Sequence, residues 1–219
     1  KAWLNGSTVK LLGEKCDLTY EYEYLGYKSD DLNVLIKKDH KKIENNRLVL
    51  LGEATLNMDC GKDILNGIKF FCNKNGYKLL ILHTAASKVG AMEMGFVSKK
   101  NFKELFSSSK VIFNLGADEI DIGPKNFVIY QGSHGDKGAN RADIILPGAA
   151  YTEESGIFVN TEGRPQIAKR ANFPPGYAKE NWAILRALSN HLDIKLDYNN
   201  IFELRKKMFN LYPNLQKIN

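Results

Sequence analysis

The sequence is poor in the residues that hold metal ions and cross-link small domains. Among its 219 residues only three are cysteines, and none of Cys16, Cys60 and Cys72 forms a Cys-x-x-Cys pair or has a suitably spaced histidine partner. This spacing excludes the common zinc and iron–sulfur motifs. We therefore expect free thiols in a reducing compartment and no metal ligands in this chain.

Long apolar runs are also missing. The longest, such as 79–82 and 144–146, fall far short of the roughly 20 residues that a membrane-spanning helix needs. We expect no direct membrane insertion. The chain begins Lys1-Ala2-Trp3 without an initiator methionine, so we expect either that a segment was removed or that the sequence starts inside a longer chain.

Arginine is scarce for a basic chain. Of 31 basic residues against 25 acidic ones, 25 are lysines and 6 are arginines, and the formal net charge is +6. A sequence-reading nucleic-acid surface favours bidentate arginines and stacking aromatics, whereas these lysines are scattered, as at Lys41-Lys42, Lys99-Lys100 and Lys206-Lys207. We expect no nucleic-acid partner, and the abundance of Lys, Asn and Ile indicates an A/T-rich genome.

What the sequence does contain is a series of short apolar runs. Runs of four to six apolar residues are typical of strands buried on both faces, as in parallel sheets covered by helices. The predicted strands are 9–13, 48–52, 79–82, 111–116, 127–131 and 144–146, with a more exposed strand and turn at 156–164.

Helical patterns alternate with these runs. In 59–73 the apolar residues follow a 3.6-residue period, with Asp59 as the predicted N-cap and Gly76 beyond the end. Further helices are predicted at 29–37, 101–106, 179–192 and 200–209. The alternation predicts an α/β fold with a doubly wound, mostly parallel sheet flanked by helices. We expect residues 1–150 to form this domain and 151–219 an extension of β-turn and helices packing on it.

A glycine-rich segment follows the predicted strand 127–131. Gly132, Gly135 and Gly138, with His134 and Lys137 among them, lie where ligands collect in open α/β sheets. The register matches neither a dinucleotide-binding fingerprint nor a P-loop, because Lys137 is not followed by Ser or Thr. A ligand loop and a structural turn both remain open, and the turn is the simpler interpretation.

Few other residues point to chemistry. His134 beside Asp136 lacks a Ser or Cys nucleophile in a recognisable turn, and His83 at a strand end is more often a hydrogen-bonded structural histidine. The carboxylates of Asp118 and Glu119 could bind Mg²⁺, or cap the following turn, which is the simpler alternative. A catalytic dyad is not predicted.

Several motifs together resemble a known family. The order of these motifs, over nearly the whole chain, is similar to the C-terminal region of the large iron–sulfur subunit of respiratory complex I, the NADH:ubiquinone oxidoreductase. The segment 142–166 is shared more loosely with molybdopterin oxidoreductases. The motifs are Asp17-Leu18-Thr19-Tyr20, Tyr24-Leu25-Gly26, 83–91, Leu115-Gly116-Ala117-Asp118, 129–136, 142–153 and Asn160-Thr161-Glu162-Gly163-Arg164.

The resemblance implies a molybdopterin-oxidoreductase-like fold that has lost its cofactor and serves as a structural part of the peripheral arm. The iron–sulfur clusters are then expected in the N-terminal region or a partner chain, and 132–138 is a relic loop. We accordingly predict no catalytic, cofactor-binding or metal-binding residues and no cofactor in this chain. The alternatives are a fragment of an active molybdopterin enzyme that binds one side of the pterin, and a free-standing nucleotide-binding domain.

The resemblance also implies partners and a location. We expect contacts with other subunits of the complex I peripheral arm, above all with the N-terminal cluster-binding half of the same subunit. The expected location is the matrix side of the mitochondrial inner membrane, or the cytoplasmic side of the inner membrane of an A/T-rich alphaproteobacterium. Either a separately encoded half or the tail of a longer chain is consistent with the sequence. Alone, such a chain should expose apolar surface and be poorly soluble.

Overall fold

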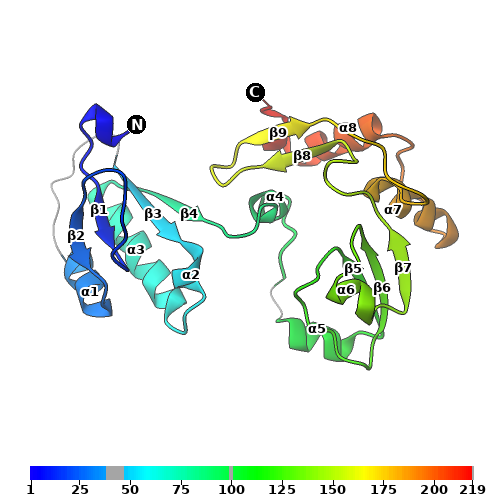
Figure 1. The fold of residues 1–219 in the computed structure, drawn as a ribbon, viewed down its shortest axis with the longest axis horizontal. Helices are drawn as coiled ribbons and strands as arrows, with labels where there is room; N and C mark the ends of the chain where they lie inside the picture. The colour runs from blue at the N-terminus through cyan, green and yellow to red at the C-terminus, as the bar shows by residue number, and fades with distance from the viewer. Residues whose placement is uncertain (38–46, 99–100, 219) are drawn as a thin grey trace. The chain divides into compact units, whose positions relative to one another are not determined.

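The structure is a computed structural model that describes residues 1–37, 47–98 and 101–218. The chain forms two compact units, Lys1–Thr84 and Ala85–Asn219, each of which is described by itself (Figure 1). No helix in the described ranges is both long enough and apolar enough to span a membrane. Two of the lysine pairs noted in the sequence, Lys41-Lys42 and Lys99-Lys100, lie outside the described residues.

The first unit consists of two parallel strand pairs with helices between and after them. β1 pairs with β2 and β3 pairs with β4. The chain between β3 and β4 passes through two helices, as a parallel connection requires. The elements are η1 (Trp3–Asn5), β1 (Lys10–Leu12), β2 (Glu23–Gly26), α1 (Ser29–Lys37), β3 (Leu48–Gly52), α2 (Glu53–Leu56), α3 (Gly61–Asn75) and β4 (Lys78–Leu82).

Helix α3 supplies the core of the first unit. Its stripe of Ile68, Phe71 and Cys72 packs with Leu51 of β3, and all four side chains are buried. Burial raises the pKa of the Cys72 thiol. Gly76 ends the helix in the left-handed conformation at φ 72°, as predicted.

The predicted N-cap of this helix is wrong. Cys60, and not Asp59, occupies the N-cap position, and no side chain caps the first turn. Gly61 opens the helix where a Cβ atom would collide with the backbone of Leu56, because the chain turns tightly through residues 57–60 between α2 and α3. The tight turn, and not a side-chain cap, therefore determines where α3 begins.

The second unit contains a three-stranded parallel sheet in the order β5-β6-β7 and an antiparallel pair, β8-β9. A short parallel bridge also joins Gly148 to Lys179. The elements are α4 (Lys88–Glu93), α5 (Phe102–Ser108), β5 (Val111–Leu115), β6 (Phe127–Gly132), α6 (Lys137–Arg141), β7 (Ile144–Pro147), β8 (Gly156–Val159), β9 (Pro165–Ala168), α7 (Asn181–His191), α8 (Ile201–Leu211) and η2 (Pro213–Gln216).

β6 is the central and most deeply buried strand of this sheet. Val128 and Tyr130 are 0% and 1% exposed, and Gln131 is 3% exposed. Since β5, β6 and β7 run parallel, their carboxyl ends lie at one edge of the sheet. The segment that follows β6 at this edge is the glycine-rich stretch 132–138, which leads into α6.

The predicted α/β class with mostly parallel strands is confirmed. Every predicted strand has its counterpart within two residues, and the strands are distributed over small sheets in the described ranges. The segment 156–164, predicted as a more exposed strand and turn, is the first strand and the turn of the β8-β9 hairpin, and Val159 at the end of that strand is buried. The division into 1–150 and 151–219 stays a prediction.

Candidate functional site

Two adjoining hollows lie at the carboxyl edge of the β5-β6-β7 sheet. The first has a volume of about 250 Å³ and the second of about 400 Å³. Both are lined by Gly132, Ser133 and His134. This edge is where open α/β sheets bind ligands. The glycine-rich segment thus lies in the position that the sequence predicts for a ligand loop.

Asp118 joins the loop after β5 to the loop after β6. Its Oδ1 accepts a hydrogen bond from the Tyr130 hydroxyl at 3.0 Å and another from the Gly138 backbone N–H at 3.2 Å. We call Asp118, Tyr130 and Gly138 the Asp118 cluster. Gly138 is in the first turn of α6, whose own N-cap, Asp136, makes no side-chain capping bond. A carboxylate from another loop therefore satisfies this turn.

Tyr130 explains two of the glycines. A Cβ atom on Gly138 would lie 2.6 Å from Cε2 of Tyr130 and 2.7 Å from Oδ1 of Asp118. A Cβ atom on Gly132 would collide with the Tyr130 phenol ring. By contrast, a Cβ atom on Gly135 would meet nothing within 4 Å. Gly132 and Gly138 are thus required by the ring that packs against them.

The electrostatics of the Asp118 cluster keep Tyr130 protonated. Burial, together with the hydrogen bond to Asp118 and the negative charges of Asp118 and Asp136, raises the pKa of Tyr130 to about 12. The phenol is therefore protonated at neutral pH and donates to the carboxylate. The pair is a stable hydrogen bond between a neutral donor and an anion.

A second polar group closes the other side of the first hollow. Gln131 donates from Nε2 to the backbone and side-chain oxygens of Asn181 at 3.1 and 3.0 Å. Asn181 in turn donates from Nδ2 to Glu154 at 3.0 Å and to the Ala149 carbonyl at 3.1 Å. The start of α7 is thereby attached to the end of β6. Oε1 of Gln131 is buried and has no hydrogen-bond partner among the described residues.

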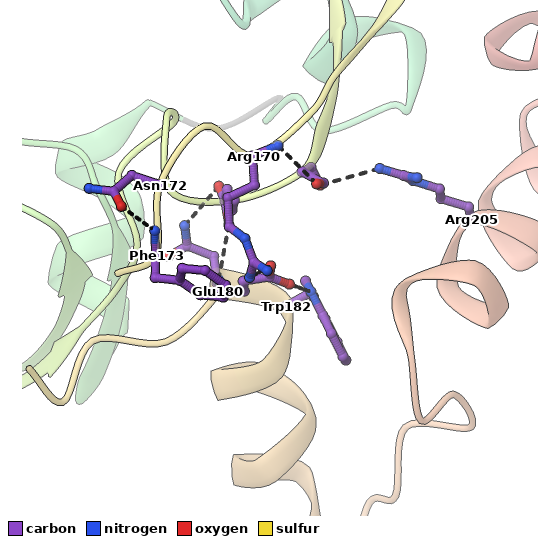
Figure 2. A network of polar contacts seen from close by, with 9 residues as sticks. Arg170, Asn172, Phe173, Glu180, Trp182 and Arg205 are labelled. Atoms are coloured by element: carbon purple, nitrogen blue, oxygen red, sulfur yellow. Dashed lines mark hydrogen bonds and ion pairs between the residues drawn. The ribbon is translucent and has the colours of Figure 1, made fainter. Parts of the chain in front are cut away.

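One wall of the second hollow is formed by the segment between β9 and α7. Figure 2 shows the polar network that holds this segment, with Arg170 and Trp182 both directed at Glu180. Arg170 forms an ion pair with Glu180 at 3.1 Å, and Nε1 of Trp182 donates to the same carboxylate at 2.6 Å. The Arg170 guanidinium also lies 4.2 Å from the centre of the Phe173 ring. These contacts fix a proline-rich wall that contributes Pro175 and Tyr177 to the hollow.

The predicted histidine and aspartate of the glycine-rich loop do not form a catalytic group. Nδ1 of His134 lies 2.9 Å from Oγ of its neighbour Ser133, on the exposed side of the loop. Asp136 and Lys137 are exposed and do not line either hollow. Within the described part of the chain, the imidazole of His134 contacts the hydroxyl of Ser133 but no carboxylate that would orient it, unlike the histidine of a hydrolytic triad.

His83 lies in the first unit, beside a buried carboxylate at the carboxyl end of β3-β4. Its Nδ1 is 3.6 Å from Oε2 of Glu53, the first residue of α2. The same oxygen accepts hydrogen bonds from the backbone N–H and the hydroxyl of Thr84 at 2.8 and 3.1 Å. The arrangement joins the ends of two neighbouring strands. Nδ1 of His83 is itself buried and has no hydrogen-bond partner among the described residues, so the hydrogen-bonded role expected for His83 stays a prediction.

The carboxylates and cysteines considered in the sequence lie in different environments. Asp118 lies in the Asp118 cluster and stabilises the first turn of α6, whereas Glu119 is exposed. Cys16 and Cys60 are exposed free thiols, and Cys72 is in the core. Within 1–37, 47–98 and 101–218 there is no group of three or more His, Cys, Asp or Glu that could hold a metal ion.

Sequence reasoning missed the residues that close the site. Tyr130, Gln131 and Asn181 carry most of its polar contacts, and Glu53 has the corresponding role in the first unit. One signal was available: Tyr130 and Gln131 are polar residues in an apolar strand that the pattern predicts to be buried, and buried polar groups need partners. The partners themselves, Asp118 and Asn181, lie 12 and 50 residues away along the chain.

Known proteins match the whole of this chain. The family described as molybdopterin oxidoreductase matches residues 1–191. The 75 kDa subunit of NADH-ubiquinone oxidoreductase from Reclinomonas americana is 39% identical over 239 aligned positions, which cover 100% of this chain and 34% of the relative. The mitochondrial 78 kDa subunits from Neurospora crassa and Candida albicans are 36% and 37% identical, and each alignment covers 98% of this chain and 31% of the relative.

These matches confirm the resemblance predicted from the motifs. The homology extends over the full chain and does not depend on the glycine-rich segment alone. The chain spans about a third of the length of the curated relatives it matches.

Proposed function

Because this chain belongs to the molybdopterin oxidoreductase family, we propose that it is a non-catalytic, structural part of the peripheral arm of respiratory complex I. The observation that carries the proposal is the full-length similarity, at 36–39% identity, to large subunits named for NADH-ubiquinone oxidoreductase. In this role the chain supports electron transfer from NADH to ubiquinone without carrying electrons itself.

The contacts at the sheet edge support the non-catalytic part of this proposal. Three polar residues that line the first hollow are engaged in contacts within the chain: Asp118 accepts from Tyr130 and Gly138, and Gln131 donates to Asn181. Tyr130 is held protonated, with its pKa raised to about 12 by burial and by Asp118. A catalytic site usually holds groups whose pKa values suit proton transfer near neutral pH, and this site holds a phenol tuned in the opposite direction.

The family implies a molybdopterin cofactor, which carries a phosphate. The residues at the sheet edge do not fit such a group. Among the residues that line the two hollows the charged side chains are Asp118 and Glu153, and neither Lys nor Arg is present in these linings. A phosphate is normally held by cationic side chains and free backbone N–H groups. We derive no reaction step through the cofactor.

The proposal extends to partners and location. The chain would contact other subunits of the peripheral arm, above all the N-terminal, cluster-binding half of the same subunit, and the iron–sulfur clusters would lie there. The arm would lie on the matrix side of the mitochondrial inner membrane. Residues 151–219 would pack as an extension on the domain formed by 1–150.

The experiment uses the chain in its own membranes. Gently solubilised respiratory membranes are separated on a native gel, stained for NADH dehydrogenase activity and probed with an antibody to this chain. Co-migration with the active band at the size of complex I is expected. Migration as a small free protein, away from all NADH dehydrogenase activity, would overturn the assignment to the complex.

A second measurement on the same band tests the non-catalytic role. Molybdenum is determined by mass spectrometry after excision, with an active molybdopterin enzyme as the positive control. The expected content is far below one atom per chain. A near-stoichiometric content would favour the alternative, a fragment of an active molybdopterin oxidoreductase that binds one side of the pterin.

A further inference from the structure

We propose that Asp118 acts as an internal anion that closes the glycine-rich loop and thereby excludes a phosphate-bearing cofactor from it. Asp118 is then a positioning residue whose carboxylate takes the hydrogen bond that a phosphate oxygen would need. This inference deepens the non-catalytic part of the proposed function and rests on it. It identifies which residue of this chain is incompatible with the cofactor.

The first step concerns the backbone donors of the loop. Glycine-rich turns bind phosphates because several backbone N–H groups point at one anion. Here the N–H of Gly138, buried in the first turn of α6, already donates to Oδ1 of Asp118 at 3.2 Å. A negatively charged acceptor from the chain itself thus engages this donor.

The second step concerns space. The Tyr130 ring lies against Gly132 and Gly138, where even a single added methyl group would collide with it. The ring is 1% exposed, and its hydroxyl is fixed by the 3.0 Å bond to Asp118. Glycines allow a ligand to approach the backbone closely, but here the space beside them is occupied by the Tyr130 side chain of β6, the strand that precedes the loop.

The third step concerns charge. A phosphate entering the first hollow would face the carboxylate of Asp118. Glu153 contributes a second carboxylate to the adjoining hollow. Like charges in a partly buried site repel strongly because water screens them less. The nearest lysine in the loop, Lys137, is exposed and is not part of either lining.

Glu119 provides the matched control. It follows Asp118 directly, carries the same charge and is exposed, while Asp118 accepts both bonds of the cluster. If only the charge near the loop mattered, the two residues would be equivalent. If the hydrogen bonds matter, only Asp118 should be sensitive.

The experiment is hydrogen–deuterium exchange on the full chain, held in its native assembly. The variants are Asp118→Ala, Asp118→Asn, Tyr130→Phe and Glu119→Ala, and peptides of 132–140 are followed, with α7 as the internal reference for global unfolding. Asp118→Ala should speed exchange of the loop by about tenfold or more, because a charge-assisted hydrogen bond is lost. Asp118→Asn keeps an acceptor oxygen but loses the charge, so it should restore only part of the protection, and Glu119→Ala should match the unsubstituted chain.

Two results would overturn the proposal. One is unchanged loop exchange in Asp118→Ala while α7 is also unchanged; if Asp118→Ala unfolds the unit, loop exchange in Asp118→Asn equal to that of the unsubstituted chain would show that the negative charge of Asp118 does not close the loop. The other is protection of the loop in the unsubstituted chain on addition of millimolar inorganic phosphate, with chloride of equal ionic strength as the control. Neither readout depends on co-migration with complex I or on molybdenum content, so failure here is distinguishable from failure of the proposed function.

Discussion

In both units a carboxylate connects the loops at the carboxyl ends of neighbouring parallel strands, but its surroundings differ between the units. In the first unit, Glu53 follows β3 and accepts the N–H of Thr84 after β4, at 2.8 Å. In the second unit, Asp118 follows β5 and accepts the N–H of Gly138 after β6, at 3.2 Å. In both, a carboxylate from one strand end receives a backbone donor from the loop after the neighbouring strand.

The difference lies in what surrounds the carboxylate. Glu53 is 6% exposed and has His83 beside it, so the edge is closed by burial. Asp118 lines a hollow of about 250 Å³, and the Tyr130 ring covers Gly132 and Gly138 beside it. The first edge is thus a buried contact between two strand ends, whereas the second borders a hollow; in the inference proposed above, this second edge is a ligand loop closed by its own chain.

The chain offers a separate probe for each edge. It contains two tryptophans, Trp3 in the first unit and Trp182 in the second. A Trp3→Phe background leaves Trp182 to report unfolding of the second unit, and a Trp182→Phe background leaves Trp3 to report the first. Urea titrations followed by fluorescence can therefore assign a change in stability to one edge.

Removing the ring should have the largest effect. Tyr130→Ala deletes a side chain that is 1% exposed and leaves a cavity above Gly132 and Gly138. We expect the free energy of unfolding of the second unit to fall by about 3–5 kcal/mol, as for other buried aromatics. Tyr177→Ala is the control, because Tyr177 is 92% exposed. Equal stability of the two variants, measured through Trp182, would contradict the covering role of the ring.

Alkaline pH should weaken the second edge. The folded chain holds the Tyr130 proton up to a pKa of about 12, whereas the unfolded chain releases it near the ordinary value of 10.0. The contribution to stability is therefore complete below pH 10 and is lost as the pH rises towards 12. Relative to Tyr130→Phe, the unsubstituted chain should lose on the order of 2 kcal/mol across this window. Parallel stability curves of the two proteins would show that the phenol does not titrate as described.

Adding a methyl group should destabilise the second unit at one glycine of the loop and not at another. A methyl group at Gly138 would meet the Tyr130 ring at 2.6 Å and Asp118 at 2.7 Å, whereas one at Gly135 would meet nothing within 4 Å. We expect Gly138→Ala to destabilise the second unit by about 1–3 kcal/mol and Gly135→Ala to leave it nearly unchanged. Thermal unfolding through Trp182 measures both. A loop that needs its glycines only for turns would respond in the same way to either change.

The sequence predicted the elements well because they depend on local patterns. A window of about a dozen residues is enough to recognise the helical period of α3 and its end at Gly76. The same holds for the apolar runs of β3 and β6. Asp59 failed as a cap because the turn from α2 determines where α3 begins, and this turn depends on a close approach at Gly61.

The site was predictable only in its position. The glycine-rich segment after a strand indicated the correct edge of the sheet, as the rule for open α/β folds requires. The hydrogen-bond pairs that close the site could not be predicted, because Asp118 is 20 residues from Gly138 and Asn181 is 50 residues from Gln131. Hydrogen bonds between segments so far apart leave no periodic signal in the sequence.

The smallest expected effect concerns the first edge. Glu53→Ala removes the acceptor of both the Thr84 N–H and its hydroxyl. We expect the first unit to lose about 1–2 kcal/mol, since a donor near the sheet edge is left without its acceptor but no large cavity forms. Glu21→Ala, an exposed glutamate of the same unit, should change stability by less than about 0.5 kcal/mol. Urea unfolding through Trp3 and exchange of the Thr84 amide measure the effect. If Glu53→Ala cost as much as Tyr130→Ala, the two edges would be equally dependent on a single side chain, and the contrast between a buried connection and a closed ligand site would fail.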